Sequence, residues 1–298
     1  MTTPLSRRSA LRQAAGSAAL LTAAASLSHR LNAADDALGK LKGRVHHSVC
    51  KWCYGKIPLD DFCKASKEMG LQSVELLNPP DFPTLQKYSL TCAMVSNPVV
   101  DGLGGIGKAW NRVEHHDKLV AAYEQRIADV ADAGFTNLIC FSGNREGLDD
   151  GKGLENCALG LQRIMKLAEE KKINIVMELL NSKVNHHDYQ CDHTDWGVAL
   201  CKKIGSERFK LLYDIYHMQI MEGDVIATIK KHHGYIAHYH TGGVPGRAEI
   251  DETQELYYPA IMKAIVETGF KGFTAQEFIP KRPDALASLK QGVGICDV

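Results

Sequence analysis

Short, mostly apolar runs alternate along this chain with longer segments that carry apolar residues every three or four positions. The runs occupy residues 45–49, 73–77, 90–95, 137–141, 174–177, 209–213, 235–239 and 272–275. They are about five residues long and do not alternate strictly between polar and apolar positions, which is typical of parallel strands buried on both faces. The pattern therefore predicts eight parallel strands separated by helices.

The segments between the runs have the periodicity of amphipathic helices. The clearest of them places its apolar residues on one face of a helix: Leu154, Cys157, Ala158, Leu161, Met165 and Ala168. Gly70, Gly134 and Gly269 each follow a helical segment and precede an apolar residue that leads toward the next strand. Glycine at that position is typical of a helix that ends in the left-handed conformation, so these three segments form a weak internal repeat.

Eight alternating strand and helix units predict an α/β fold, a (β/α)8 TIM barrel. Residues 35–298 are close to the roughly 250 residues typical of such a barrel. No Pro- or Ser-rich linker divides residues 45–295, so one catalytic domain is the economical interpretation. The alternative, an open doubly wound sheet, needs a Gly-rich phosphate-binding turn after its first strand. The glycines of residues 101–105 follow no such strand.

The first 34 residues differ in composition from the rest of the chain. Arg7 and Arg8 precede an alanine- and leucine-rich stretch over 14–27, and small residues follow at 32–34. This layout predicts a twin-arginine export signal over 1–34 and a periplasmic location, with an uncleaved N-terminus as the alternative. The apolar stretch is too short for a stable membrane span.

The charge balance points to a small-molecule partner. The chain has 35 Lys and Arg residues and 35 Asp and Glu residues, whereas proteins that bind nucleic-acid phosphates usually carry a basic excess. We therefore expect no nucleic-acid partner and leave a homo-oligomer open. The nine cysteines show no regular pairing pattern, and several lie in apolar runs, so most are interpreted as structural.

Ionisable residues stand at the ends of several predicted strands. Glu75 ends the second, and the last four end on Glu178, Asp214, His240 and Glu277 in turn. Residues at these ends point into the mouth of a barrel, where its active site lies. Three carboxylates and one imidazole suit a single Mg²⁺, Mn²⁺ or Co²⁺ ion better than a thiolate-type zinc site. Such an ion would polarise a carbonyl and its neighbouring hydroxyl while glutamates move a proton.

Four segments resemble the hydroxypyruvate isomerase family of xylose-isomerase-like barrels, which has the ketose 3-epimerases as relatives. They are ELLN from Glu178, YDIYH from Tyr213, HYHTGGVPGR from His238 and QEFIP from Gln276. The resemblance extends from about residue 45 to residue 282, nearly the whole chain after the predicted signal. The chain departs from it at His240, where hydroxypyruvate isomerases often carry Gln and the epimerases carry His.

The resemblance implies a role for each residue of the predicted site. Glu178 and Glu277 are implied to be metal ligands and also the catalytic acid/base pair. Asp214 and His240 are implied as the other two ligands, and His217 and Arg247 as substrate-binding residues. Apart from the resemblance, Glu75 is a further substrate-binding candidate because it ends the second predicted strand; its alternative is a barrel-mouth carboxylate paired with Lys51 or Arg145.

The expected activity is isomerisation of a small hydroxy-carbonyl compound, with hydroxypyruvate to tartronate semialdehyde as the leading example. A keto-sugar 3-epimerase or related sugar isomerase is the close alternative. An abasic-site endonuclease would need additional ligands and a basic groove. A non-catalytic sugar-binding barrel would not need two glutamates at the metal.

The export interpretation can be tested directly. Replacing Arg7 and Arg8 by lysine should hold the precursor in the cytoplasm, because the paired arginines are the distinguishing feature of this type of signal. Cell fractionation with an antibody to the chain measures the effect. Unchanged export of the double variant, or a mature protein that begins at Met1, would contradict the interpretation.

Overall fold

The computed structural model describes residues 40–298, and the predicted export signal over 1–34 lies outside the described residues. Residues 41–298 form one compact unit. Seven strands build its parallel sheet: β1 (His46–Cys50), β2 (Ser73–Glu75), β3 (Asn137–Cys140), β4 (Asn174–Glu178), β5 (Phe209–Asp214), β6 (Ile236–Thr241) and β7 (Phe273–Gln276). Their order in the sheet is β2-β1-β7-β6-β5-β4-β3.

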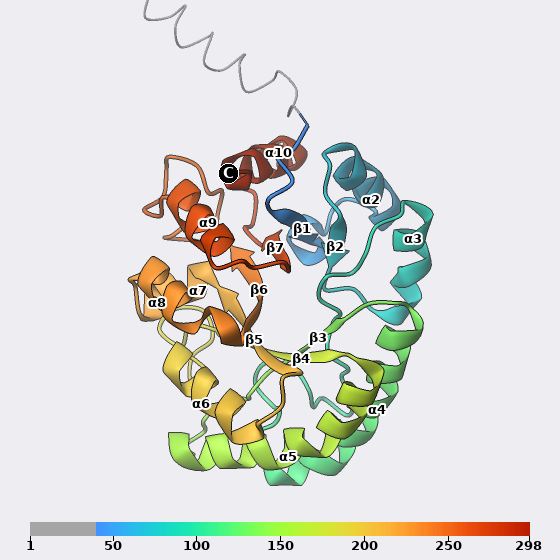
Figure 1. Cartoon of the computed structure of the whole chain (residues 1–298), viewed down its shortest axis with the longest axis vertical. Coiled ribbons are helices and arrows are strands. Elements are labelled where there is room, and N and C mark those ends of the chain that lie inside the picture. Colours follow the sequence, from blue (N-terminus) through green and yellow to red (C-terminus); the bar gives the residue numbers. More distant parts are fainter. Residues whose placement is uncertain (1–39) are drawn as a thin grey trace, which may run out of the picture. The chain divides into compact units, whose positions relative to one another are not determined.

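Helices surround this sheet (Figure 1). The α-helices are α2 (Leu59–Glu68), α3 (Phe82–Lys87), α4 (His116–Asp132), α5 (Asp150–Lys171), α6 (Thr194–Ile204), α7 (Ile215–Met221), α8 (Val225–His232), α9 (Tyr258–Glu267) and α10 (Ala285–Cys296). The described residues also form four short 3-10 helices: η1 (Lys51–Tyr54), η2 (Pro79–Asp81), η3 (Val113–His115) and η4 (His233–Tyr235). The alternation of strand and helix, with every strand pair parallel, confirms the predicted barrel.

The third of the eight predicted strands, residues 90–95, is not a regular strand, yet it occupies the gap between β2 and β3. Leu76 N donates to Met94 O at 2.8 Å, and Val95 N donates to Asn137 O at 2.9 Å. Between these points the ladder is interrupted at Ala93. Its backbone N–H bonds to Ser73 Oγ at 2.8 Å and its carbonyl to Asn137 Nδ2 at 2.7 Å. Two side chains thus replace backbone partners, and the segment connects the edges of the seven-stranded sheet.

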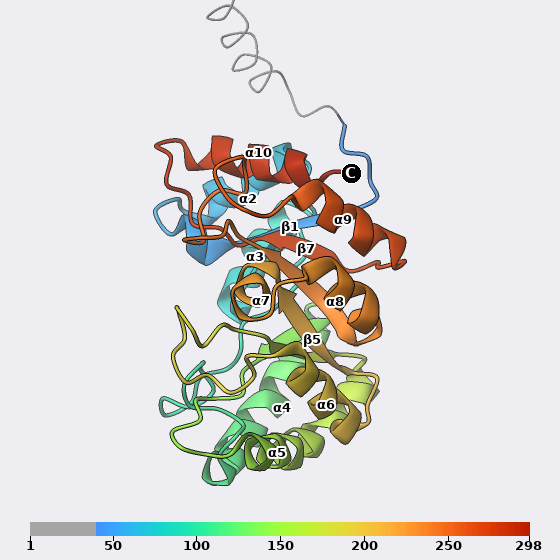
Figure 2. The same ribbon diagram turned by 90° about the vertical axis from the view of Figure 1, so that its left-hand side faces the viewer.

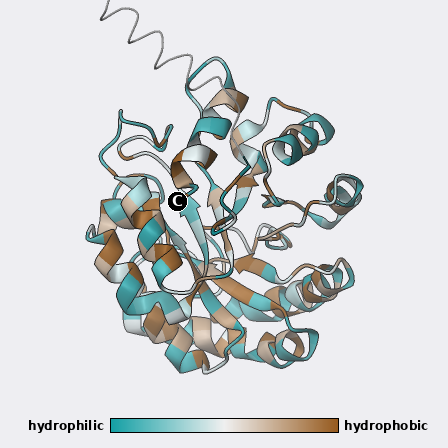
Figure 3. Ribbon diagram, turned by 45° about the horizontal axis from the view of Figure 1, so that its top comes forward, coloured by the Kyte–Doolittle hydropathy of each residue, from teal (hydrophilic) through white to brown (hydrophobic). Residues whose placement is uncertain are grey.

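The helices pack as their periodicity predicts. In α5 the residues Cys157, Ala158, Leu161, Met165 and Ala168 are buried. Hydrophobic and hydrophilic positions accordingly alternate around the helices in Figure 3. Gly70, Gly134 and Gly269 all have positive φ, at 86°, 75° and 81°, which confirms the left-handed ends of α2, α4 and α9.

Two further expectations concern cysteines and membranes. All nine cysteines lie in the described part of the chain, and none of them forms a disulfide there. Eight are buried, which agrees with a structural role. Within residues 40–298, no helix combines the length and the apolar character needed to cross a bilayer.

Side views show that the loops following the strands gather along one side of the molecule (Figure 2). This is the side at which the carboxyl ends of parallel strands meet, so the ends of β4, β5, β6 and β7 open toward these loops. Residues far apart in the sequence therefore meet there, such as Trp52 and Glu277, which are 225 positions apart.

The interrupted strand generates a stability prediction. Asn137→Ala leaves the buried carbonyl of Ala93 without its partner, so we expect the free energy of unfolding to fall by about 1–3 kcal/mol. Chemical denaturation of the metal-loaded protein measures it. The neighbouring exposed residue gives a matched control, since Thr136→Ala should change stability by less than about 0.5 kcal/mol. Equal effects of the two changes would contradict the role of the Asn137 side chain.

Candidate active site

The four predicted metal-ligand residues converge at the carboxyl ends of their strands. Glu178 ends β4, Asp214 ends β5, His240 lies near the end of β6, and Glu277 directly follows β7. The sheet register places Asp214 beside His240. One ligand-type atom from each residue lies within 4.8 Å of the others. All four side chains are buried, so the cluster is held inside the barrel mouth.

Three carboxylates in one buried cluster repel one another. Burial raises the pKa of Asp214 to about 8, with a contribution from Glu277 and against the opposing effect of Arg247. Burial also raises the pKa of Glu178. Burial alone would raise the pKa of Glu277 too, but the nearby Arg247 and His240 outweigh it and hold the pKa well below its ordinary value. The cluster therefore lacks enough positive charge to ionise all three groups.

The donor set fits a divalent cation. Glu178 Oε1 is buried and has no hydrogen-bond partner, which is costly for a carboxylate unless something else satisfies it. Three carboxylates and one imidazole are the hard and borderline donors that Mg²⁺, Mn²⁺ and Co²⁺ accept. Among the described residues, this is the largest group of ligand-type side chains within mutual reach.

Helix α7 positions His217 beside Asp214. Asp214 is the N-cap of this helix, and its Oδ1 accepts a hydrogen bond from His217 N at 3.2 Å. His217 Nδ1 accepts a bond from the backbone N–H of Asn181 at 3.1 Å, so the ring proton must be on Nε2. Burial lowers the pKa of His217 well below its ordinary value. His217 is thus a neutral ring whose Nε2–H has no hydrogen-bond partner and lies 3.6 Å from Asp214 Oδ2.

Arg247 reaches the cluster from the loop between β6 and α9. Its guanidinium lies between the rings of Trp52 and Tyr216, at 5.2 and 5.4 Å from their centroids. Nη2 donates to Asp214 Oδ2 at 3.1 Å and to Glu277 Oε2 at 2.5 Å. The loop is tight, since a Cβ at Gly243 would lie only 2.3 Å from Glu249 O. Arg247 is therefore held rigidly beside the ligands, where it could also meet an anionic substrate.

Glu75 does not belong to the four-residue ligand cluster but lies behind it. It is fully buried behind His240, and His238 and His240 both contact its Oε1 at 2.8 Å. Neither of the partners considered for it, Lys51 and Arg145, contacts it. Lys51 Nζ donates to Tyr54 O.

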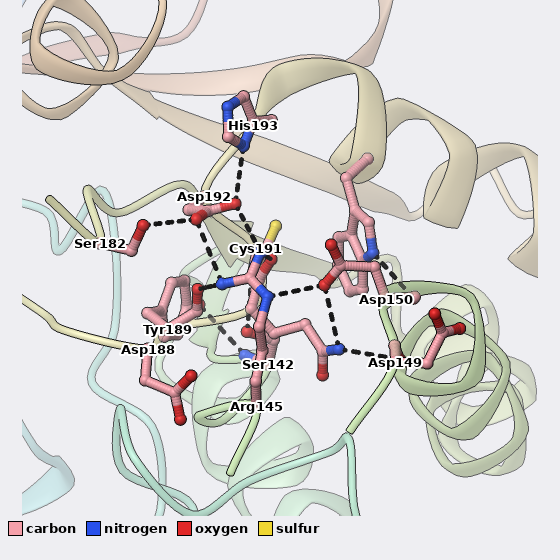
Figure 4. Close-up of polar contacts among 12 residues, drawn as sticks. Ser142, Arg145, Asp149, Asp150, Ser182, Asp188, Tyr189, Cys191, Asp192 and His193 are labelled. Atoms are coloured by element: carbon pink, nitrogen blue, oxygen red, sulfur yellow. Dashed lines mark hydrogen bonds and ion pairs between the residues drawn. The ribbon is translucent and has the colours of Figure 1, made fainter. Parts of the chain in front are cut away.

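Arg145 belongs to a separate network that fixes the loop after β4. It bonds to Asp150 at 2.7 Å and to Asp192 at 2.9 Å, and Asp192 also accepts from Ser182 (Figure 4). Asn181, which holds His217, lies in the same loop. Arg145 therefore contacts the loop beyond β4 and not the ligand cluster itself.

Trp52 is a further residue of the site that the sequence did not predict. Its Nε1 donates to Glu277 Oε1 at 2.9 Å, and it follows β1 in η1 on the same side of the barrel as the ligands. Its position two residues beyond a strand end was the signal that could have identified it. His238 and His240 are two positions apart on one strand, so their side chains point to the same face, which here is the interior of the barrel.

A cavity of about 360 Å³ opens onto the cluster. Glu178, Glu277 and Arg247 line it together with Trp52, Ser96, Asn97 and His186, and its apolar wall consists of Leu76, Ile106, Ile139, Phe141 and Leu180. Asp214, His217 and His240 are fully buried and lie outside the lining. The cavity thus gives a small molecule direct access to two glutamates and one arginine.

Residues 63–293 match the profile of the xylose isomerase-like TIM barrel family, and the chain belongs to this family. It is 32% identical over 128 residues to a 2-oxo-tetronate isomerase of Cupriavidus necator, covering 43% of this chain and 47% of that one. It is also 32% identical over 106 residues to a hydroxypyruvate isomerase of Escherichia coli, covering 35% and 41%. The matches span less than half the length of these two curated relatives.

A solved structure described as an AP endonuclease, family 2, from Brucella melitensis has the same fold. It superposes with a TM-score of 0.74 at 24% identity, over 83% of this chain and 96% of that one. The likeness concerns the barrel alone.

The charge deficit of the cluster generates a prediction about metal binding. Because the pKa of Asp214 is raised to about 8, this group holds a proton at neutral pH that a bound cation must displace. Affinity for Mn²⁺ should therefore increase between pH 6 and pH 8 and then level off, with proton release on binding. Titration calorimetry in buffers of different ionisation enthalpy measures both quantities.

Proposed function

We propose that the protein is a metal-dependent isomerase of a small hydroxy-carbonyl compound, with hydroxypyruvate, converted to tartronate semialdehyde, as the leading substrate. One observation carries the proposal: Glu178 and Glu277 belong to the ligand cluster and also line the same cavity. Two proton-transfer groups on either side of a bound substrate are what such a reaction needs. The names of the two curated relatives support the reaction class.

The reaction moves hydrogen between adjacent carbons. A bound Mg²⁺, Mn²⁺ or Co²⁺ would polarise the carbonyl and the neighbouring hydroxyl. One glutamate takes a proton from the hydroxymethyl carbon, and the other returns a proton to the former carbonyl carbon. The former hydroxymethyl oxygen loses its hydrogen as it becomes the new carbonyl, and the former carbonyl oxygen gains one, so atoms and charge balance.

Other side chains hold the reacting groups. The Trp52 N–H orients Glu277 through its bond to Oε1. The His217 Nε2–H has no hydrogen-bond partner in the protein; the ring does not line the cavity but lies beside Asp214, so it would donate to a substrate oxygen that reaches the metal ligands. Arg247, lining the cavity, supplies positive charge for a substrate carboxylate.

The wall of the cavity favours a short substrate. Five of its lining residues, Leu76, Ile106, Ile139, Phe141 and Leu180, offer no polar side chains. Besides the two glutamates and Arg247, only Trp52, Ser96, Asn97 and His186 could bond to the several hydroxyls of a long keto-sugar. A keto-sugar 3-epimerase remains the close alternative because it uses the same pair of glutamates and, in its relatives, a histidine at the position of His240. An abasic-site endonuclease is less well supported, since the ligand cluster involves four residues and the cavity contributes one arginine.

The mechanism predicts a large loss of turnover on replacing either glutamate. Glu178→Gln and Glu277→Gln preserve side-chain volume and one oxygen ligand but cannot accept a proton at neutral pH. General acid-base catalysis contributes a factor of about 10² to 10⁴, so kcat should fall at least about a hundredfold. Turnover of hydroxypyruvate, 2-oxo-tetronate and free keto-sugars in D₂O, followed by NMR, measures the loss and identifies the substrate.

Two controls make the result interpretable. Metal content is determined in each sample, because a lost ligand would mimic a lost base. Glu222→Gln is the matched variant, since Glu222 bonds to Thr194 outside the cavity, and its kcat should stay within about threefold of wild type. Variants at Glu178 and Glu277 that both retain near-wild-type turnover at equal metal content would refute the mechanism. Cleavage of abasic DNA by the wild type, without isomerisation, would favour the endonuclease.

A further inference from the structure

A second polar cluster lies directly behind the proposed metal ligands. It consists of Ser48 and Cys50 from β1, Glu75 from β2, and His238 and His240 from β6; we call it the Glu75 cluster. All five side chains are fully buried, and none of them lines the cavity. The sheet order separates β2 from β6 by two strands, so these residues meet through the interior of the barrel.

Glu75 is the centre of this cluster. Its Oε1 lies 2.8 Å from His238 Nε2 and 2.8 Å from His240 Nε2, and its Oε2 accepts from Ser48 Oγ at 2.5 Å. The Cys50 Sγ lies 3.8 Å from Oε1. A buried carboxylate is costly unless hydrogen bonds satisfy it, and here both oxygens have donors. Nothing in the isomerase mechanism uses Glu75, so its burial needs another reason.

The two nitrogens of His240 face different carboxylates. Nε2 faces Glu75, whereas Nδ1 lies 2.7 Å from Glu277 Oε2 and 3.5 Å from Glu178 Oε1. An ionised carboxylate only accepts hydrogen bonds, so the contact with Glu75 requires a proton on Nε2. A cation bound among the ligands would displace the proton shared between Nδ1 and Glu277, which leaves the lone pair on Nδ1, the nitrogen that faces the metal ligands.

We propose that Glu75 is a positioning residue of the metal centre: it holds His240 with its proton on Nε2 and so presents Nδ1 to the cation. Metal-binding histidines commonly donate their second ring N–H to a carboxylate, which fixes the ring orientation and makes the ligand more basic. The proposal rests on the metal centre of the proposed function and is independent of the substrate. His238 shares Oε1 and fixes the carboxylate from the other side.

The Glu75 cluster also offers a competing arrangement. Cys50, Glu75 and His240 lie close enough together to hold a cation of their own. In that case Nε2 of His240 would bind a second ion and would carry no proton. The two arrangements therefore differ in the number of ions bound and in the protonation of one nitrogen.

Metal binding by three variants tests the positioning role. Glu75→Met removes the acceptor, and we expect Mn²⁺ affinity to fall about 10- to 100-fold in titration calorimetry. Glu75→Gln should lose less, since the amide oxygen can still accept from both histidines while the amide N–H₂ donates to Ser48. Tyr239→Phe is the matched control: Tyr239 is buried on the same strand next to His240, its hydroxyl has no hydrogen-bond partner, and affinity should not change.

A measurement on the wild-type protein tests the proposal even if the Glu75→Met variant does not fold. In the Mg²⁺-loaded wild type, ¹⁵N NMR of the histidine rings should find His240 protonated at Nε2 and not at Nδ1, with one ion bound per chain. An unprotonated Nε2, two ions per chain, or a folded Glu75→Met variant that binds Mn²⁺ within threefold of wild type would overturn the proposal. So would a wild-type chain that binds no divalent ion, whereas a chain that binds one ion but isomerises nothing would contradict only the proposed function.

Discussion

The burial of three carboxylates beside one another is the constraint on which the site depends. Glu178, Asp214 and Glu277 meet because parallel strands end at the same edge of the barrel, and the protein interior screens their repulsion poorly. Arg247 and a protonated His240 supply at most two positive charges, which do not balance three ionised carboxylates. The protein alone therefore leaves the cluster short of positive charge, and a divalent cation would remove the deficit.

Rigid neighbours keep this unfavourable arrangement in place. The backbone N–H of Asn181 fixes His217, the indole of Trp52 fixes Glu277, and two aromatic rings hold the guanidinium of Arg247. Asn181 lies in the connection after β4, Trp52 in the one after β1 and Arg247 in the one after β6, while Tyr216 belongs to α7. Such a shell matters because a ligand set that could relax would separate its charges and lose affinity for the cation.

The sequence predicted those parts of the molecule that depend on local pattern. Buried parallel strands have a characteristic composition, and strand ends define the barrel mouth, so Glu178, Asp214, His240 and Glu277 could be brought together from their positions alone. The irregular segment over 90–95 could not be predicted, because its shape depends on Ser73 and Asn137 replacing backbone partners of Ala93. The partners of Glu75 could not be predicted either, since they lie across the barrel interior and 163 or 165 residues away in sequence.

Buried polar side chains near the two ends of the barrel differ in whether they find hydrogen-bond partners within the protein. At the amino ends of the strands, Asn137 bonds to Asn174, and Asn174 accepts from Arg208, so these polar groups satisfy one another within the protein. At the carboxyl ends, Glu178 Oε1 and His217 Nε2 remain without partners. The Glu75 cluster lies behind the ligands: both oxygens of Glu75 have donors, and His240 Nδ1 faces Glu277 and Glu178. The incomplete groups of the ligand cluster thus lie at the end where a cation and a substrate can complete them, which is where a barrel enzyme binds its ligands.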